Sequence, residues 1–284
     1  MNNKSPAISI ITVCFNAAQF LEQTIRGVLA QTYPHIHYII IDGGSSDGTV
    51  EIIPKYEPRL DYWHSQPDRG LGHAFNLGMA RAHGEWILYL NADDFFLDAS
   101  VVEKMVPHLV THRDTDVVYG NCISMTREQD TQPAPFRQIL GGPWNWQVFR
   151  RRCTLPHQAA FTNRRYFDRV GQFNEAFAIA VDYEFYLRGG ASLKAVHVPL
   201  AVSGMREGGL SGNPVNTLRE ARNAQILNQA LPPWLAQVNF LAAIGRHFGG
   251  RLLHKLLDPF FSIISLPGRN WAGSYNGQRE KVHK

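Results

Sequence analysis

The segment EWILYLNADD, residues 85–94, is an apolar run that ends on an asparagine and two adjacent carboxylates. Its apolar part, from Trp86 to Leu90, has the length and composition of a strand that is buried on both faces. In a parallel α/β sheet, ligands bind at the carboxyl ends of the strands, so Asp93 and Asp94 indicate a metal or a polar ligand. Alternatively, one of the two carboxylates caps the helix that follows.

The segments around this run alternate between strand-like and helix-like patterns. Stretches rich in β-branched and aromatic residues predict strands at 7–15, 35–42, 60–65, 85–91 and 116–125. Apolar residues at helical spacing predict helices near 18–31, 49–56, 71–82 and 100–109. Pro107 is expected to shorten or kink the last of these helices. This order predicts an α/β fold with a mostly parallel, doubly wound sheet and helices on both faces.

The pattern changes after residue 125. The sequence from Thr126 to Pro156 has no periodicity, which predicts a long loop over one end of the sheet. A helix-like DYEFYLR at 182–188 and a strand-like KAVHVPLAV at 194–202 come next in the chain. Two more helical stretches, at 216–230 and 234–257, complete it. We therefore expect a main domain at 1–213 and a helical extension at 214–284.

Charge and cysteine content narrow the class of protein. Of the net charge of +4, the residues from Pro214 onward contribute +6, since nine Lys and Arg face three Asp and Glu there. This distribution argues against nucleic-acid binding by the main domain and favours an anionic partner, such as a membrane surface, for the tail. Three cysteines without CxxC spacing favour neither a disulfide framework nor a zinc site. With no secretory pattern and no spanning apolar run, we expect a cytoplasmic location.

The turns after the strands lack the two common phosphate-binding patterns. The segment CFNAAQF, at 14–20, contains no glycine, so the GxGxxG fingerprint is missing, and GxxxxGK[ST] does not occur either. Any phosphate must therefore be held in another way. A metal bound by the carboxylates of LNADD would do so.

Several segments, in this order and spacing, resemble the inverting family 2 glycosyltransferases with the GT-A fold, especially bacterial enzymes that build capsule, exopolysaccharide or O-antigen. They lie at 12–16, 39–49, 65–94, 155–161, 170–188 and 208–211. The resemblance implies transfer of a sugar from a nucleoside diphosphate sugar, with UDP favoured, to a glycan acceptor that is lipid-linked, for example through polyprenyl diphosphate. It also implies Mn²⁺ or Mg²⁺ as cofactor and a place at the cytoplasmic face of the inner membrane.

The resemblance assigns nucleotide contacts to the ends of the first strands. Asp42 matches a carboxylate that accepts hydrogen bonds from the imide of a base, a role that suits uracil, thymine or guanine. The alternative is that Asp42 only orders the turn before GGSSDG. Many relatives carry a second Asp where this chain has Gly43. Asp47 is interpreted as the N-cap of the helix near Thr49. The other expected nucleotide contacts are Thr12, Asn16, Asp68, Arg69 and Asn91.

Arg69 and the LNADD segment have alternatives of their own. The Arg69 guanidinium suits phosphate oxygens, and a solvated surface charge is the alternative. Relatives commonly carry Asp-x-Asp at Asn91 to Asp93, where the second acid binds the metal and the first contacts ribose or a metal-bound water. Asn91 keeps an acceptor oxygen but loses the charge. Because a cation on a nucleoside diphosphate needs only one or two protein carboxylates, Asp93 is the expected ligand. Asp94 then supports the sugar or caps the next helix.

The segment VDYEFYLR is expected to supply the catalytic base. Direct displacement requires a carboxylate that takes the proton of the acceptor hydroxyl, and Asp182 matches the family position for it. A helix N-cap is the alternative for Asp182. Glu184 is spaced i,i+4 from Arg188, which predicts a surface ion pair.

Further candidates lie on the acceptor side and in the tail. His157 and Gln158 precede the strand-like AAF and either contact the acceptor or diphosphate or serve the structure. Arg206 is the expected cation for the leaving diphosphate. For the aromatic and arginine-rich loop at 144–152, sugar and diphosphate contacts compete with core packing and solvated charge. The basic amphipathic segment 234–266 either lies in the membrane interface or packs on the main domain.

Two other functions are compatible with the sequence. A catalytically silent nucleotide- or glycan-binding module is one, because Asn91 replaces an acid. A nucleotidyltransferase is the other, and the absence of a glycine-rich basic loop after the first strand counts against it.

Overall fold

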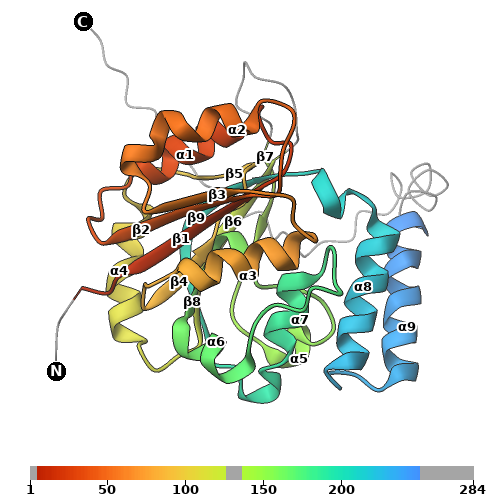
Figure 1. The fold of residues 1–284 in the computed structure, drawn as a ribbon. Coiled ribbons are helices and arrows are strands. Elements are labelled where there is room, and N and C mark those ends of the chain that lie inside the picture. Colours follow the sequence, from red (N-terminus) through yellow and green to blue (C-terminus); the bar gives the residue numbers. More distant parts are fainter. Residues whose placement is uncertain (1–4, 126–135, 250–284) are drawn as a thin grey trace, which may run out of the picture. The chain divides into compact units, whose positions relative to one another are not determined.

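A computed structural model describes residues 5–125 and 136–249 (Figure 1). The chain divides into two compact units, of which the first ends at Ala242 and the second begins at Ala243. The boundary that we expected after residue 213 therefore falls inside the first unit.

The first unit is built on one mixed sheet. In space its strands follow the order β3-β2-β1-β4-β8-β6-β9-β5, and β7 pairs with β6. The strands are β1 (Ile8–Cys14), β2 (Ile36–Asp42), β3 (Tyr62–Ser65), β4 (Trp86–Tyr89), β5 (Asp94–Phe96), β6 (Val117–Met125), β7 (Phe136–Leu140), β8 (Ala160–Asn163) and β9 (Ala195–Arg206).

The parallel character that the sequence predicts is concentrated in the first half of the chain. Strands β1, β2, β3 and β4 pair in parallel, as do β6 and β9. Strands β8, β7 and β5 join their neighbours antiparallel. Because β1, β2 and β4 run the same way, their carboxyl ends meet at one edge, which is where an α/β sheet binds its ligands.

Helices cover both faces of this sheet, as predicted (Figure 1). On one face, α1 (Leu21–Leu29) and α4 (Val101–Thr111) bury their apolar sides against alternate residues of β1, among them Ile8 and Ile10. On the other face, Ile11 and Val13 share a core with α3 (Leu71–Arg81), α6 (Arg164–Val170) and α7 (Val181–Leu187). The alternation along β1 follows from the two-residue period of a strand.

Short and C-terminal elements complete the described chain. They are α2 (Thr49–Ile52), α5 (Trp146–Phe149), α8 (Pro214–Leu227) and α9 (Pro233–Ile244), with 3₁₀ turns at Ile53–Arg59, His157–Ala159, Gly190–Ser192 and Gly209–Gly212 and a π-helical turn at Gly245–Gly249. In Figure 1, α8 and α9 lie next to α7. No helix in the described ranges is both long and apolar enough to cross a membrane.

The structure corrects two expectations about local structure. Pro107 does not shorten α4, which runs through it to Thr111. Pro107 and Glu103, whose carbonyl loses its helical partner, both lie on the exposed side of the helix, where water can bond that carbonyl. The segment expected as one long loop contains strand β7 and helix α5, although 126–135 lie outside the described residues.

Candidate active site

The carboxyl edge of β1, β2 and β4 gathers the polar residues that the sequence singled out. Cys14 and Asp42 are paired in the β1–β2 register. Beyond β4, the chain continues beside β1, since the Ala92 amide donates to the Val13 carbonyl over 3.2 Å. The LNADD segment therefore lies one strand away from the end of β2.

Asp42 is buried and is held by a ring of donors. Its Oδ2 accepts hydrogen bonds from the Gly44 amide, the Ser45 amide and the Ser65 hydroxyl at 3.0, 3.0 and 2.7 Å. The Ser45 hydroxyl and the Cys14 thiol donate to Oδ1. Burial raises the pKa of Asp42, but these hydrogen bonds outweigh burial and leave the pKa below its usual value. Asp42 thus stays ionised and orders the turn after β2, the alternative role considered for it.

A second loop is tied to that turn. The Asn16 side chain accepts the Ser46 amide at 3.0 Å, and the Asn16 amide donates to the Ser45 hydroxyl at 2.7 Å. Asp47 accepts the Thr49 amide at 3.0 Å and the Ala18 amide at 3.1 Å. The N-cap of α2 is Gly48, not Asp47 as predicted. Asp47 lies one residue before the N-cap and still bonds the Thr49 amide. The structure does not bring Thr12 here, because it is buried and its hydroxyl bonds Tyr38.

An exposed ring completes this side of the edge. Phe15 follows β1 and is 65 % exposed, unlike the other apolar residues near it. A Cβ at Gly43 would lie 2.6 Å from Asp68 Oδ2 and 3.4 Å from the Phe15 ring. Phe15, Gly43 and Asp68 therefore border one space. Phe15 was not predicted as a site residue. The sequence does not distinguish an aromatic residue at a strand end that faces the core from one that faces a ligand.

The LNADD carboxylates differ in their surroundings. Asp94 is buried, and burial followed by repulsion from Asp93 raises the pKa of Asp94 well above its usual value. Among the described residues, Asp94 Oδ1 and Asn91 Oδ1 are buried without a hydrogen-bond partner. Two orphaned oxygens beside the Asp93 carboxylate are hard donors of the kind that Mg²⁺ and Mn²⁺ or their bound waters prefer. The chemistry of these oxygens fits such a cation, and Asp93 as its ligand stays a prediction.

The protein alone does not form a cage for this cation. Within 5–125 and 136–249, no three His, Cys, Asp or Glu side chains are grouped closely enough to hold a metal ion. A cation bound through Asp93 would depend on oxygens from a ligand for the rest of its coordination, which matches the preference of Mg²⁺ for phosphate and water.

A chain of hydrogen bonds connects the LNADD segment to α7. The Asn91 side-chain nitrogen lies 3.2 Å from His157 Nε2, and His157 Nδ1 lies 2.9 Å from Asp182 Oδ2. With the amide nitrogen of Asn91 facing Nε2, the imidazole proton sits on Nδ1 and is donated to Asp182. The sequence predicted all three residues but not this connection, because 25 residues separate His157 from Asp182.

This pair is partly buried and electrostatically coupled. Burial lowers the pKa of His157, but the nearby carboxylates of Asp182, Asp94 and Asp93 outweigh it and raise the pKa above its usual value. Burial raises the pKa of Asp182, yet His157 and backbone amides leave it below its usual value. Asp182 is therefore a carboxylate near neutral pH. It is the second residue of α7, whose N-cap is Ala180, so the capping alternative for Asp182 is not found.

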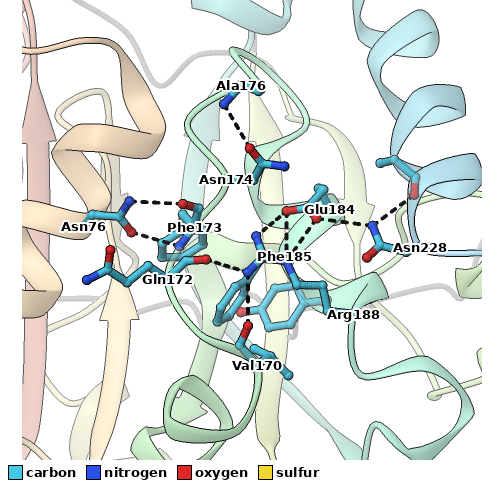
Figure 2. Close-up of polar contacts among 12 residues, drawn as sticks. Asn76, Val170, Gln172, Phe173, Asn174, Ala176, Glu184, Phe185, Arg188 and Asn228 are labelled. Atoms are coloured by element: carbon cyan, nitrogen blue, oxygen red, sulfur yellow. Dashed lines mark hydrogen bonds and ion pairs between the residues drawn. The ribbon is translucent and has the colours of Figure 1, made fainter.

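The other acid of α7 is inaccessible. Glu184 and Arg188 form the predicted ion pair, with Nε 3.0 Å from Oε1, but Glu184 is only 2 % exposed. The pair is therefore buried, not a surface pair. Arg188 also donates to the carbonyl of Val170, at the end of α6, and to that of Gln172 (Figure 2). A buried and paired Glu184 leaves Asp182 as the accessible acid of this helix.

Other predicted cations are engaged by protein groups. Arg69 bonds Glu175 at 2.7 and 3.0 Å. Arg206 donates to the Asp93 carbonyl at 2.7 Å and to Gln23, and its guanidinium lies 4.7 and 4.8 Å from the rings of Phe20 and Phe95. Arg206 therefore lies at the LNADD segment, and its role toward the diphosphate stays a prediction, while Arg69 bridges to the loop before α7.

The remaining acceptor-side candidates serve the structure in this state. Gln158 is buried, and its amide donates to the Met205 sulfur at 2.9 Å. Trp144 and Trp146 pack against the buried Phe149, and their ring centroids lie 5.0 and 6.2 Å from its own. The core-packing alternative for the two tryptophans is thus the one observed.

The fold and this edge define an α/β protein that binds a polar, oxygen-rich ligand at the carboxyl ends of its strands. The chain belongs to glycosyl transferase family 2, whose model matches residues 9–171. The resemblance seen in the sequence is confirmed, and the protein is a glycosyltransferase with the expected fold.

Two relatives illustrate the similarity in sequence. The chain is 33 % identical over 189 residues to an uncharacterized glycosyltransferase of Mycobacterium tuberculosis (strain ATCC 25618 / H37Rv), covering 65 % of this chain and 69 % of the other. It is 28 % identical over 218 residues to a PGL/p-HBAD biosynthesis glycosyltransferase of Mycobacterium bovis (strain BCG / Pasteur 1173P2), covering 75 % and 82 %.

Two solved structures share the fold. TarS of S. aureus in complex with UDP-GlcNAc superposes with a TM-score of 0.62 at 17 % identity, covering 86 % of this chain and 73 % of that one. The mannosyltransferase PcManGT from Pyrobaculum calidifontis, in complex with GDP-Man and Mn²⁺, gives 0.59 at 17 % identity, covering 93 % and 78 %.

Proposed function

We propose that this glycosyltransferase is a metal-dependent, inverting enzyme that moves a sugar from a UDP-sugar to a glycan acceptor of a cell-surface polysaccharide or glycolipid. The observation that carries the proposal is the line from Asn91 through His157 to Asp182, which starts beside Asp93 and ends on an accessible carboxylate. On this proposal, the metal that accompanies the diphosphate lies near one end of this line, and the group that accepts the proton is at the other end.

The donor nucleotide would lie at the ends of β1 and β2. The exposed ring of Phe15 offers a stacking face for a base, and Asp68 Oδ2, beside Gly43, offers an acceptor for an imide N–H. Asp42 and Asn16 hold the two loops that shape this space. An imide donor is present in uracil and absent from cytosine and adenine, which supports UDP.

Asp93 would hold Mn²⁺ or Mg²⁺, and Asn91 and Asp94 would face its bound water or the ribose. When bound, the cation stabilises negative charge on the departing diphosphate. Arg206, fixed to the Asp93 carbonyl at 2.7 Å, brings a permanent positive charge to the same place. Arg69 is the more distant candidate, since it must exchange Glu175 for a phosphate oxygen.

Asp182 would act as the general base. The bond from the acceptor oxygen to the anomeric carbon forms as the bond from that carbon to the diphosphate oxygen breaks, and the hydroxyl proton passes to Asp182. His157 binds Oδ2 of Asp182, which leaves Oδ1 for the hydroxyl. A single displacement without a protein nucleophile inverts the anomeric configuration. His157 therefore orients the base, and Gln158 supports the turn that carries His157.

The tail supports action at a membrane. Trp234, Val238 and Leu241 of α9 are 68 %, 55 % and 57 % exposed and recur at i, i+4 and i+7, so they form one apolar stripe. The chain after α9 contains Arg246, Arg251 and Lys255. An apolar stripe next to basic residues suits the anionic cytoplasmic face of the inner membrane, where a lipid-linked acceptor would be found.

The first test is thermal unfolding with UDP, GDP, dTDP or CDP, each with and without Mn²⁺. A ligand at 100 times its dissociation constant stabilises the folded state by about 2.7 kcal/mol. We expect UDP with Mn²⁺ to give the largest rise in Tm, and we expect Asp93→Asn to lose the metal-dependent part of that rise. A nucleotide effect that is equal with and without Mn²⁺ would contradict the metal assignment.

Turnover tests the base. Asp182→Asn should keep the UDP-dependent rise in Tm. The rate at which it releases UDP from a UDP-sugar should fall by about a hundredfold or more, because general-base catalysis contributes on that scale. Unchanged UDP release in this variant would contradict the role of Asp182.

A further inference from the structure

Helix α7, which carries Asp182, begins without a capping side chain of its own. Its N-cap residue, Ala180, has no group that could accept the amides of the first turn. The residues just before the helix have three consecutive amides that need acceptors, since buried or half-buried N–H groups are seldom left unpaired.

All three amides point to one carboxylate from a distant element. Glu220 of α8 accepts the amides of Ala178, Ile179 and Ala180, with Oε2 at 3.1, 2.7 and 2.9 Å. The Ala178 amide also reaches Oε1 at 3.3 Å. Hydrogen bonds to an ionised acceptor are shorter and stronger than neutral ones, and three in succession fix the backbone of this turn.

Other contacts keep α8 along α7. The Gln225 side chain donates to the Tyr183 hydroxyl at 3.2 Å, and the Asn228 side chain donates to Glu184 at 3.2 Å (Figure 2). These two contacts lie further along both helices than Glu220 and do not bond the turn before Asp182. Of the three side chains, only Glu220 bonds the turn that leads directly into Asp182.

The earlier part of the same loop has different anchors. Asn76 of α3 bonds the amide and carbonyl of Phe173 at 2.8 and 3.0 Å, and Arg188 bonds the carbonyl of Val170, the last residue of α6 (Figure 2). These contacts fix the start of the loop, and Glu220 accepts the three amides of residues 178–180 at its end.

We propose that Glu220 is a positioning residue, which sets the start of α7 so that Asp182 meets both His157 and the acceptor hydroxyl. The inference rests on the proposed role of Asp182 as base. It makes α8 part of the catalytic apparatus although no residue of α8 reaches the reacting atoms.

The test compares Glu220→Ala and Glu220→Gln with Asn228→Ala, a control that removes another hydrogen bond from α8 to α7 but leaves the turn before Asp182 intact. One readout is the NMR titration of the His157 ring in metal-free protein, assigned with His157→Gln. His157 faces Asp182, Asp94 and Asp93. The other readout is kcat and donor KM for release of UDP from a UDP-sugar with water as acceptor.

Glu220→Ala should move the His157 titration down toward 6.5, the ordinary histidine value, because Asp182 no longer lies at a fixed 2.9 Å. We expect kcat to fall about tenfold or more with donor KM changed less than about twofold, since misplacing a catalytic group by about 1 Å costs rate, not donor binding. Glu220→Gln keeps one acceptor oxygen and should lie between wild type and Glu220→Ala. Asn228→Ala should resemble wild type in both readouts at a similar loss of Tm.

A wild-type titration of His157 in Glu220→Ala, or a loss of kcat no larger than that of Asn228→Ala, would overturn the proposal. Should Glu220→Ala fail to fold, Glu220→Gln carries the same comparison. Failure of this proposal can be told apart from failure of the proposed function. Full turnover by Asp182→Asn would show that Asp182 is not the base, and the His157 titration would still report whether Glu220 fixes Asp182.

Discussion

Asp68 occupies, in space, the position that a side chain at residue 43 would take. A Cβ on Gly43 would come within 2.6 Å of Asp68 Oδ2. Its other oxygen accepts the Gly70 amide at 2.7 Å, so the carboxylate is held at the start of α3. An acid from the segment after β3 therefore lies where a side chain at the end of β2 would lie.

The His157–Asp182 pair makes stability depend on pH at the scale of two residues. The pKa of His157 is raised in the folded state, so its contribution is present below the unfolded value of 6.5 and is lost as pH rises through the folded pKa. The pKa of Asp182 is lowered, so its contribution is present above the unfolded value of 3.8 and is lost as pH falls through the folded pKa. Both contributions coexist between these two values.

His157→Gln should therefore destabilise the protein most in mildly acidic solution. A charge-assisted hydrogen bond of a partly buried pair contributes about 1–2 kcal/mol, so we expect a loss of that size near about pH 5.5. The difference from wild type should shrink as the pH rises through the folded pKa of His157, because the imidazole then loses its charge. Urea unfolding of both proteins over this range gives the free energies. A difference that does not change with pH would show that the two groups are not coupled.

At this scale the sequence located the acids but not their partners. Asp93 was singled out by its place at a strand end, and Asp42 and Asp182 by the family resemblance; in the structure, Asp93 and Asp182 both act on His157. The Asn91–His157–Asp182 line and the Glu220 contacts join segments 25 to 66 residues apart. No local pattern encodes such contacts, because they exist only when β4, the His157 turn and α7 are packed.

Helix α3 illustrates how close packing positions the site at the scale of an element. Gly78 faces β1, and a Cβ there would be closer to Ile11 Cγ2 than real Cβ contacts allow. Gly27 of α1, in contrast, would place its Cβ 3.9 Å from the Phe96 amide nitrogen, which is an ordinary contact. The two helical glycines therefore have opposite reasons to be present: one is required by packing and the other is not.

Alanine at these two positions should have effects of opposite sign. Gly78→Ala should destabilise by about 1 kcal/mol or more, because overpacking at a buried site costs about 1–3 kcal/mol and exceeds the gain in helix propensity. Gly27→Ala should stabilise by up to about 1 kcal/mol, since propensity acts there without a clash. Chemical denaturation measures both values. Stabilisation by Gly78→Ala would mean that α3 can move away from β1 at no cost.

Elements were predicted in proportion to their length and periodicity. Apart from β5, the strands and helices up to Met125 were placed within a few residues, because each buries a continuous apolar face that the sequence displays. Strands β5 and β7 and helix α5 were missed. These elements have three to five residues, too few to show a period, and they form because β9, β6 and the core around Phe149 offer partners.

At the scale of the whole molecule, the position of α8 changes where the chain divides. We expected the main domain to end at residue 213, because charge and composition shift there. Yet α8 supplies Glu220, Gln225 and Asn228 to α7, and the first compact unit extends to Ala242. Polar contacts of this kind leave no apolar stripe in the sequence. A protein truncated after residue 213 would thus lose Glu220, which bonds the turn before Asp182, together with the tail.

The apolar stripe of α9 permits a milder test of membrane association. Trp234→Ser with Leu241→Ser removes two side chains that are 68 % and 57 % exposed, while Ile139→Ser on β7 removes one that is 60 % exposed elsewhere and serves as the matched control. Burying an apolar side chain contributes about 1.5–3 kcal/mol, so loss of two partly inserted residues should weaken binding to phosphatidylglycerol vesicles by about tenfold or more.

The same vesicles separate the apolar contribution of α9 from the charge of the tail. Added salt screens the attraction between basic residues and anionic lipid but leaves apolar insertion intact, so wild type should retain part of its binding at about 0.5 M salt while the double variant should not. Co-sedimentation with the vesicles measures both proteins, and far-UV circular dichroism confirms that α9 remains helical. If the double variant sediments like wild type and Ile139→Ser at every salt concentration, the stripe does not contact the membrane.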